Sequence, residues 1–302
     1  MTTEDQLIEL VYGDTDSLYM SYEGLINTIE GVENMTLREK VEIIVRINQE
    51  FLNQHNKEFM EEYYAPRHSR DMVQEFELET VCKSGVWLNV KKRYAQVLAW
   101  QDGKYFDEDD MPVKAKGLEI VKSSYPSLGR KILKELMNHL INSEHTNGAL
   151  CVHEMNIIAQ QRKREWDAAD IELICPTTSV NYYMKYIEDD TNPLGPVARK
   201  KAPFQVKGLA MYNCLRQGYN LPGDPLYGGK MRYYAIKGSN PKNVQFFCFQ
   251  AGSYPKWAPQ YAPIDRSVMY QRCVLDPINR VLEACGMPLL SLTGFIQPNL
   301  FG

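Results

Sequence analysis

The stretch from residue 7 to residue 22, LIELVYGDTDSLYMSY, constrains the fold of this chain more than any other. Apolar and β-prone residues lead up to Tyr12, residues 13 to 16 (GDTD) interrupt them, and polar and apolar side chains then alternate from 17 to 22. Glycine and aspartate supply the backbone freedom that a tight turn needs. The pattern therefore predicts two antiparallel strands joined by a short hairpin turn.

The hairpin turn carries two acidic residues, Asp14 and Asp16, separated by one position. If the backbone is extended through Thr15, both carboxylates point to the same side. Carboxylates that lie so close repel one another unless a cation lies between them, and hard oxygen ligands favour Mg²⁺ or Mn²⁺. The alternative is an ordinary turn in which the aspartates hydrogen-bond to their own backbone.

The composition is that of an ordinary globular protein, and 302 residues favour two domains. No apolar run approaches the roughly 20 residues that span a bilayer, and the acidic N-terminus does not look like a signal peptide. Seven cysteines without a C-x-x-C pair indicate free thiols in a reducing compartment. We therefore expect a cytoplasmic protein without a membrane segment.

The formal net charge of −4 does not indicate a nucleic-acid binder, but basic residues form local clusters. In one of them, Lys91 to Tyr94, three cations and an aromatic side chain interrupt a strand-like run. This segment is either a charged edge strand that prevents aggregation or a contact for nucleic-acid phosphates and bases. The acidic pair Glu77 and Glu79 lies in an alternating segment, and we interpret it as part of an ordinary strand rather than an exonuclease metal site.

The spacing of apolar residues along the sequence predicts the remaining helices and strands. A capping box at Thr36 and Glu39 starts a helix that ends near Tyr64, and its apolar stripe is expected to cover the sheet that carries the hairpin. The other expected elements are strands at 72–81, 86–95 and up to 100, helices from 126, at 146–169 and at 265–286, a strand-to-helix run at 204–215, and strands at 231–237 and 244–250.

Several of these segments resemble family B DNA polymerases. The string from Tyr12 to Ser17 resembles the hairpin motif of the palm, whose acidic tip holds the catalytic metals. Residues 91–94 resemble the K-K-x-Y motif that grips the primer–template, and residues 116–126 resemble the K-G-x-E-x-x-(R/K)-x-x-x-P segment where palm passes into thumb. Residues 200–213 are similar to the thumb of tailed-phage replicative polymerases.

The resemblance implies an α+β fold. It predicts part of a palm, an antiparallel sheet with a packed helix, over residues 1–120, and a mainly helical thumb over 121–290. Residues 291–302 form a tail, in which Q-x-x-L-F resembles a peptide that docks on the sliding clamp, with Gln297, Leu300 and Phe301 as its contacts. A frayed apolar terminus is the alternative for this tail.

The resemblance also implies roles for individual residues. Asp14 and Asp16 would be catalytic and would hold two Mg²⁺ ions, or Mn²⁺, with Asp16 as the firmer ligand. Support for the turn would come from Tyr12, Gly13, Thr15 and Ser17. Contacts with DNA would come from Lys91, Lys92, Arg93, Tyr94, Lys116, Gly117, Lys122, Ser123 and Ser124.

Two motifs of the family are absent from the sequence: D-x-x-S-L-Y-P-S, which brings the other metal-binding aspartate, and the fingers motif K-x-x-x-N-S-x-Y-G. We therefore expect the C-terminal subunit of a split polymerase, inactive alone, in the cytoplasm of an infected bacterium if a phage encodes it. Its partners would be primer–template, deoxynucleotide, a chain with the exonuclease, remaining palm and fingers, and the sliding clamp. The alternatives are a non-catalytic remnant that binds DNA or tethers a clamp, and a fragment of an interrupted gene.

The absence of these two motifs also predicts an exposed apolar surface. Half a palm would leave unpaired sheet edges and exposed apolar side chains along the hairpin strand from Leu7 to Tyr12. We expect a large hydrophobic interface with the partner chain to cover them.

Overall fold

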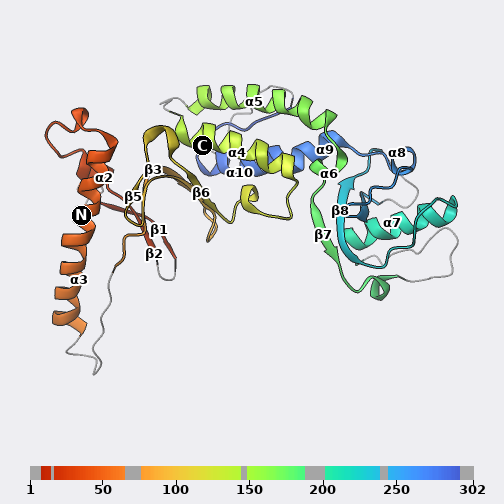
Figure 1. The fold of residues 1–302 in the computed structure, drawn as a ribbon, viewed down its shortest axis with the longest axis horizontal. Coiled ribbons are helices and arrows are strands. Elements are labelled where there is room, and N and C mark those ends of the chain that lie inside the picture. The colour runs from red at the N-terminus through yellow and green to blue at the C-terminus, as the bar shows by residue number, and fades with distance from the viewer. Residues whose placement is uncertain are drawn as a thin grey trace. The chain divides into compact units, whose positions relative to one another are not determined.

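The computed structural model describes residues 8–14, 17–64, 76–143, 148–187, 201–238 and 244–292 (Figure 1). The chain divides into two compact units, Met1–Leu118 and Glu119–Gly302. Each unit contains antiparallel strands together with helices, so the fold is mixed α and β, in agreement with an α+β class. The assignment of the units to palm and thumb stays a prediction.

The first unit begins with the hairpin that the sequence predicts. Strands β1 (Glu9–Asp14) and β2 (Ser17–Ser21) pair antiparallel in a sheet of their own. Tyr12 lies opposite Tyr19 and Asp14 opposite Ser17, and a bulge between Leu10 and Tyr12 shifts the register. Thr15 and Asp16 lie outside the described residues. A short helix, α1 (Glu23–Ile26), follows the hairpin.

The second sheet of this unit is built around β4 (Tyr94–Gln101), which is buried along nearly its whole length. It pairs antiparallel with β3 (Thr80–Trp87), β5 (Lys104–Tyr105) and β6 (Val113–Lys116). The strand expected at 72–81 starts only at Thr80, and residues 71–75 are outside the described part. The expected strand through 86–95 is also wrong in its middle, because the chain reverses between β3 and β4 and residues 91–93 lie in that turn.

The predicted long helix is present, and its capping box is confirmed. The Thr36 hydroxyl accepts a hydrogen bond from the backbone N–H of Glu39, whose carboxylate accepts one from the backbone N–H of Thr36 at 2.7 Å. An unbroken helical run follows: α2 (Leu37–Arg46), a π-helical segment (Ile47–Leu52), α3 (Asn53–Phe59) and a second π-helical segment (Met60–Tyr64).

The helix covers a different sheet from the one expected. Val41 of α2 is buried against Val81 of β3 and against Ala99 and Trp100 of β4, so α2 packs on the four-stranded sheet and not on the hairpin sheet. Tyr22, the residue that follows the hairpin, contacts the long helix: its hydroxyl donates a hydrogen bond to the Asn48 side chain at 3.0 Å. The physical reason is that α2 is the part of the long helix that carries the buried apolar side chain.

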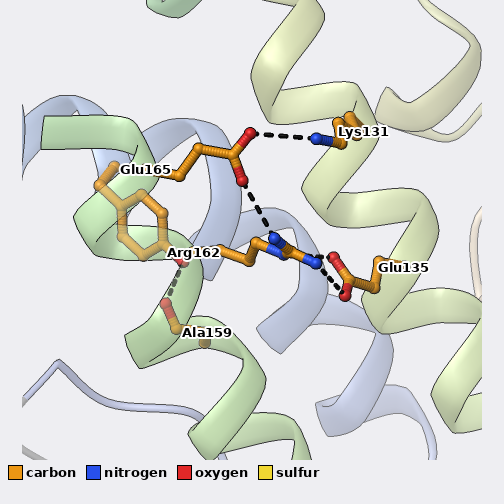
Figure 2. Close-up of polar contacts among 6 residues, drawn as sticks. Lys131, Glu135, Ala159, Arg162 and Glu165 are labelled. Atoms are coloured by element: carbon orange, nitrogen blue, oxygen red, sulfur yellow. Dashed lines mark hydrogen bonds and ion pairs between the residues drawn. The ribbon is translucent and has the colours of Figure 1, made fainter. Parts of the chain in front are cut away.

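The second unit contains the predicted helix pair α4 (Ser127–Asn142) and α5 (Gly148–Ala168). The α4 stripe predicted to be apolar, Leu128, Ile132, Leu136 and Leu140, is buried. Figure 2 shows Arg162 of α5 between two glutamates: its guanidinium forms two hydrogen bonds, of 2.7 and 2.8 Å, with Glu135 of α4 and one with Glu165. The remaining helices of the C-terminal core are α6 (Ile171–Ile174), α9 (Arg266–Tyr270) and α10 (Asp276–Ala284), the last two joined by a π-helical segment.

The second unit also contains a sheet, and two of its strands correspond to those expected at 231–237 and 244–250. Strands β7 (Thr177–Val180), β8 (Gly229–Ala235) and β9 (Phe246–Gln250) pair antiparallel in that order. Helix α7 (Phe204–Gly218) packs on β9, where a Cβ atom at Gly208 would come within 2.6 Å of the Cys248 sulfur. The segment 204–215, which was expected to change from strand to helix, is helical throughout. A short helix, α8 (Ala258–Tyr261), follows the sheet.

None of the helices in the described ranges combines the length and hydrophobicity that a bilayer crossing requires. All seven cysteines are free thiols.

Candidate functional site

The turn between β3 and β4 lies against the end of β1. The backbone N–H of Lys92 donates a hydrogen bond to the Tyr12 hydroxyl at 2.7 Å. The Lys92 ammonium lies 3.5 Å from a carboxylate oxygen of Asp14. One residue of the turn therefore contacts two of the hairpin residues for which the resemblance predicted a role.

The conformation of Lys92 explains why a glycine must follow β6. Lys92 has a left-handed backbone with φ 61°, and its carbonyl lies directly against Gly117, which has φ 69°. A Cβ atom at Gly117 would lie 2.2 Å from the Lys92 carbonyl oxygen, a distance that no side chain tolerates. Lys116, one residue earlier, pairs with Tyr94 across the sheet. The hairpin, the basic turn and the K-G segment thus meet at one place within the first unit.

Aromatic side chains form the floor of this site. Tyr12 and Tyr19 of the hairpin pack with Trp87 and Tyr94 of the four-stranded sheet, at ring-centroid distances between 5.3 and 6.5 Å. The Tyr19 hydroxyl donates to the Tyr94 hydroxyl at 2.9 Å. Burial of Tyr19, together with its contact with Tyr94, raises the pKa of the Tyr19 phenol well above its usual range. The cluster fixes the hairpin on the sheet and keeps the Tyr19 phenol neutral.

The sequence did not indicate Tyr19 and Trp87 as site residues. A partial signal was available, because a hairpin centred on residues 15 and 16 places Tyr19 opposite Tyr12 on the same face. No local signal indicates Trp87, whose ring covers Gly85 so closely that a Cβ there would come within 2.6 Å of it.

The acidic part of the site is only partly described. The Asp14 side chain is 12 % exposed and lies beside the Lys92 ammonium, which favours its charged form. Asp16, the predicted firmer metal ligand, and Thr15 lie outside the described residues. Within the described ranges, no group of three or more His, Cys, Asp or Glu side chains could hold a metal ion.

The basic residues of the turn differ in exposure. Lys91, Lys92 and Lys116 are exposed, Arg93 is half-buried, and Tyr94 is buried in the aromatic cluster. The side chains of Lys91, Lys92 and Lys116 reach solvent, with the Lys92 ammonium beside Asp14, whereas Tyr94 contributes to the packing of the site.

The other predicted DNA contacts lie in the second unit. The Lys122 ammonium forms an ion pair at 3.2 Å with Glu119, which also receives Arg280. Ser123 and Ser124 are exposed, and the Ser124 carbonyl accepts a hydrogen bond from the backbone N–H of Thr177 at the start of β7. The predicted clamp-binding residues Gln297, Leu300 and Phe301 lie outside the described residues.

Comparison with known proteins gives one informative likeness. No protein-family model matches the chain. The chain is 22 % identical over 252 residues to a DNA-directed DNA polymerase from Escherichia phage RB69. The alignment covers 81 % of this chain and 26 % of that polymerase, so the chain spans about a quarter of the length of its relative. This likeness supports a distant relationship to DNA polymerases.

Proposed function

We propose that this chain is the C-terminal subunit or fragment of a split family B DNA-directed DNA polymerase, in which it provides part of the palm and the thumb. The observation that supports this proposal best is the double contact of Lys92 with Tyr12 and Asp14. It joins two segments 80 residues apart that resemble two motifs of the same enzyme family. The distant likeness to a phage DNA polymerase supports the same function.

The metal site of this proposal is shared with another chain. Asp14 offers hard oxygen ligands that suit Mg²⁺ or Mn²⁺, and Asp16 would offer more. The contact between Asp14 and Lys92 is consistent with Asp14 as the weaker ligand of the pair. When bound, the two metal ions stabilise the charge on the attacking and leaving oxygens of nucleotidyl transfer. The aspartate of the absent D-x-x-S-L-Y-P-S motif would come from the partner.

This chain's own residues would hold the DNA. The exposed ammonium groups of Lys91, Lys92 and Lys116 would contact primer–template phosphates and bases. Tyr12 and Gly117 would hold the turn in the conformation that presents them. In the second unit, Lys122, Ser123 and Ser124 would also contact the duplex backbone.

The exposed outer face of the hairpin is a reason to propose a partner chain. Its inner face carries Tyr12 and Tyr19, and the opposite face carries Leu10 and Leu18, which are 65 and 50 % exposed. A two-stranded sheet with an open apolar face is marginal in water and needs further strands or a covering element. We propose that the chain carrying the remaining palm, the fingers and the exonuclease covers this face. Gln297, Leu300 and Phe301 would dock the assembly on a sliding clamp.

The test is primer extension with Mg²⁺ and deoxynucleotides by this chain, by the partner chain and by both together. The proposal predicts synthesis only by the combination. Robust extension by this chain alone would contradict the shared metal site. If the combination does not extend a primer, while this chain binds duplex DNA with a steep salt dependence that is indifferent to Asp16→Ala, the non-catalytic DNA-binding remnant is the correct function.

A further inference from the structure

The second half of the long helix leaves the core of the first unit. The run from Leu37 to Tyr64 is continuous, but Asn48 is its last buried residue among those whose exposure is described. Figure 1 shows α3 as the orange helix that continues from α2. One contact of α3 is a reciprocal pair of 2.8 Å hydrogen bonds between the Asn53 side chain and the Phe76 backbone.

The surface of this half of the helix carries aromatic side chains as well as polar ones. Phe51 and Phe59 are 62 and 55 % exposed. Residues four apart are neighbours on a helix surface. Phe51 stacks on His55 at 5.7 Å and Phe59 on Tyr63 at 5.1 Å. These four residues, 51, 55, 59 and 63, form a row along the helix that we call the aromatic ridge.

A second row runs beside the aromatic ridge, one residue earlier at each step. It consists of Glu50, Gln54, Glu58 and Glu62, all exposed, with Gln54 donating to Glu58 at 3.1 Å. Between residues 49 and 63 there are four glutamates, at 50, 58, 61 and 62, against the single lysine at 57. The exposed aromatic rings are therefore bordered by negative charge.

We infer that the aromatic ridge is a docking surface for a protein partner that presents an amphipathic helix whose apolar face is bordered by lysine and arginine. Exposed aromatic side chains at i, i+4 spacing are the anchors of helix-in-groove recognition. The acidic row requires positive charge on the partner, because like charges across an interface oppose binding. The same charge opposes nucleic acid and anionic membranes, and it opposes a second copy of this ridge, which would bring glutamates against glutamates.

This inference does not depend on the proposed polymerase function, because it uses neither the hairpin nor the basic turn. It also gives a role to the exposed face of this helix. Most of the stability of a protein helix comes from packing of its apolar face, and α3 has no buried residue. A partner on the ridge would supply that packing.

The test uses the full chain and a fluorescein-labelled amphipathic peptide of leucine and lysine as the probe, followed by fluorescence anisotropy. Phe59→Ala with Phe51→Ala is expected to weaken binding about tenfold or more, as truncated anchors do. Glu58→Lys with Glu62→Lys is expected to weaken it by a similar factor and to reduce its salt dependence. Tyr182→Ala, at an 82 % exposed tyrosine of the second unit, is the matched control and should bind like the parent chain.

Thermal unfolding of the same variants separates a docking surface from a core. The inference predicts nearly unchanged unfolding midpoints for the phenylalanine pair, since both rings are more than half exposed and, within the described ranges, stack only on neighbours four residues away. A midpoint lowered by the double substitution would overturn the inference, because the ridge would then pack within the chain. Equal peptide affinity for all variants would also overturn it, and so would a dimer in sedimentation that the substitutions abolish.

Discussion

The backbone N–H of Lys92 donates to the hydroxyl of Tyr12, a residue 80 positions earlier, over 2.7 Å. This contact fixes a basic turn against the end of an acidic hairpin. The Lys92 ammonium beside Asp14 adds an electrostatic contact, and the glycine that follows β6 leaves room for the turn. The candidate site depends on the geometry of this one turn.

Gly117→Ala should disrupt the site. The added Cβ would lie 2.2 Å from the Lys92 carbonyl oxygen, at a backbone φ of 69° that disfavours alanine. A loss of about 2 kcal/mol or more in the free energy of unfolding is expected, from steric overlap added to backbone strain. Denaturant unfolding measures it. Gly103→Ala is the control, since Gly103 has φ 87° and open space around its Cβ position, and it should lose only about 1 kcal/mol.

Tyr12→Phe removes the hydrogen bond that holds the turn and keeps the ring. The expected loss is about 1 kcal/mol of stability, the usual net contribution of one hydrogen bond. Because the turn then loses its fixed conformation, affinity for duplex DNA at low salt should fall as well. Filter binding and urea unfolding provide the two measurements. Tyr182→Phe removes an exposed hydroxyl and should change neither quantity; equal effects of the two substitutions would refute the role of the Tyr12 hydroxyl.

Arg162→Lys tests the clasp between α4 and α5. The arginine forms two hydrogen bonds with Glu135 and one with Glu165, and a lysine cannot reproduce that fork. The side chains are partly exposed, so solvent screening limits the expected loss to roughly 1 kcal/mol or less. A double-mutant cycle with Glu135→Gln at low and high salt measures it. A coupling energy that does not shrink with salt would show that the clasp is not an ion pair in solution.

The capping box predicts a pH dependence at the start of the long helix. The backbone N–H and the hydroxyl of Thr36 both donate to Glu39, and the first of these lowers the pKa of the Glu39 carboxyl most. A lowered folded-state pKa means that the contribution is present above the ordinary glutamate pKa and is lost as the pH falls through the lowered value. NMR titration of the Glu39 carboxyl should show this, and Thr36→Ala should return the pKa toward the ordinary value. An unchanged pKa in that variant would contradict the box.

Local patterns predicted the elements that local interactions determine. The alternation around residues 13 to 16 predicted the hairpin, Thr36 and Glu39 predicted the helix start, and the stripe beginning at Leu128 predicted the buried face of α4. In each case the signal and the structure lie within a few residues of one another.

Features that depend on distant contacts could not be predicted in this way. Continuous β-prone residues on both sides of Lys92 suggested a strand, whereas its left-handed backbone turns the chain. Tyr19 belongs to the site because its hydroxyl donates a hydrogen bond to Tyr94, 75 positions away. The choice of α2 to cover the β3–β4 sheet depends on packing against Val81 and Trp100, which no pattern within the helix indicates.

The most direct measurement of the central claim is the rate of single-nucleotide incorporation by the complex of this chain with the proposed partner chain, at saturating Mg²⁺ and primer–template. Asp16→Ala should reduce that rate by about a thousand-fold, since an Mg²⁺ ligand that acts in the transition state contributes several kcal/mol. Asp14→Ala should reduce it less, and Lys122→Ala should act mainly on DNA affinity. A complex that incorporates nucleotide at the parent rate with Asp16→Ala would contradict the claim.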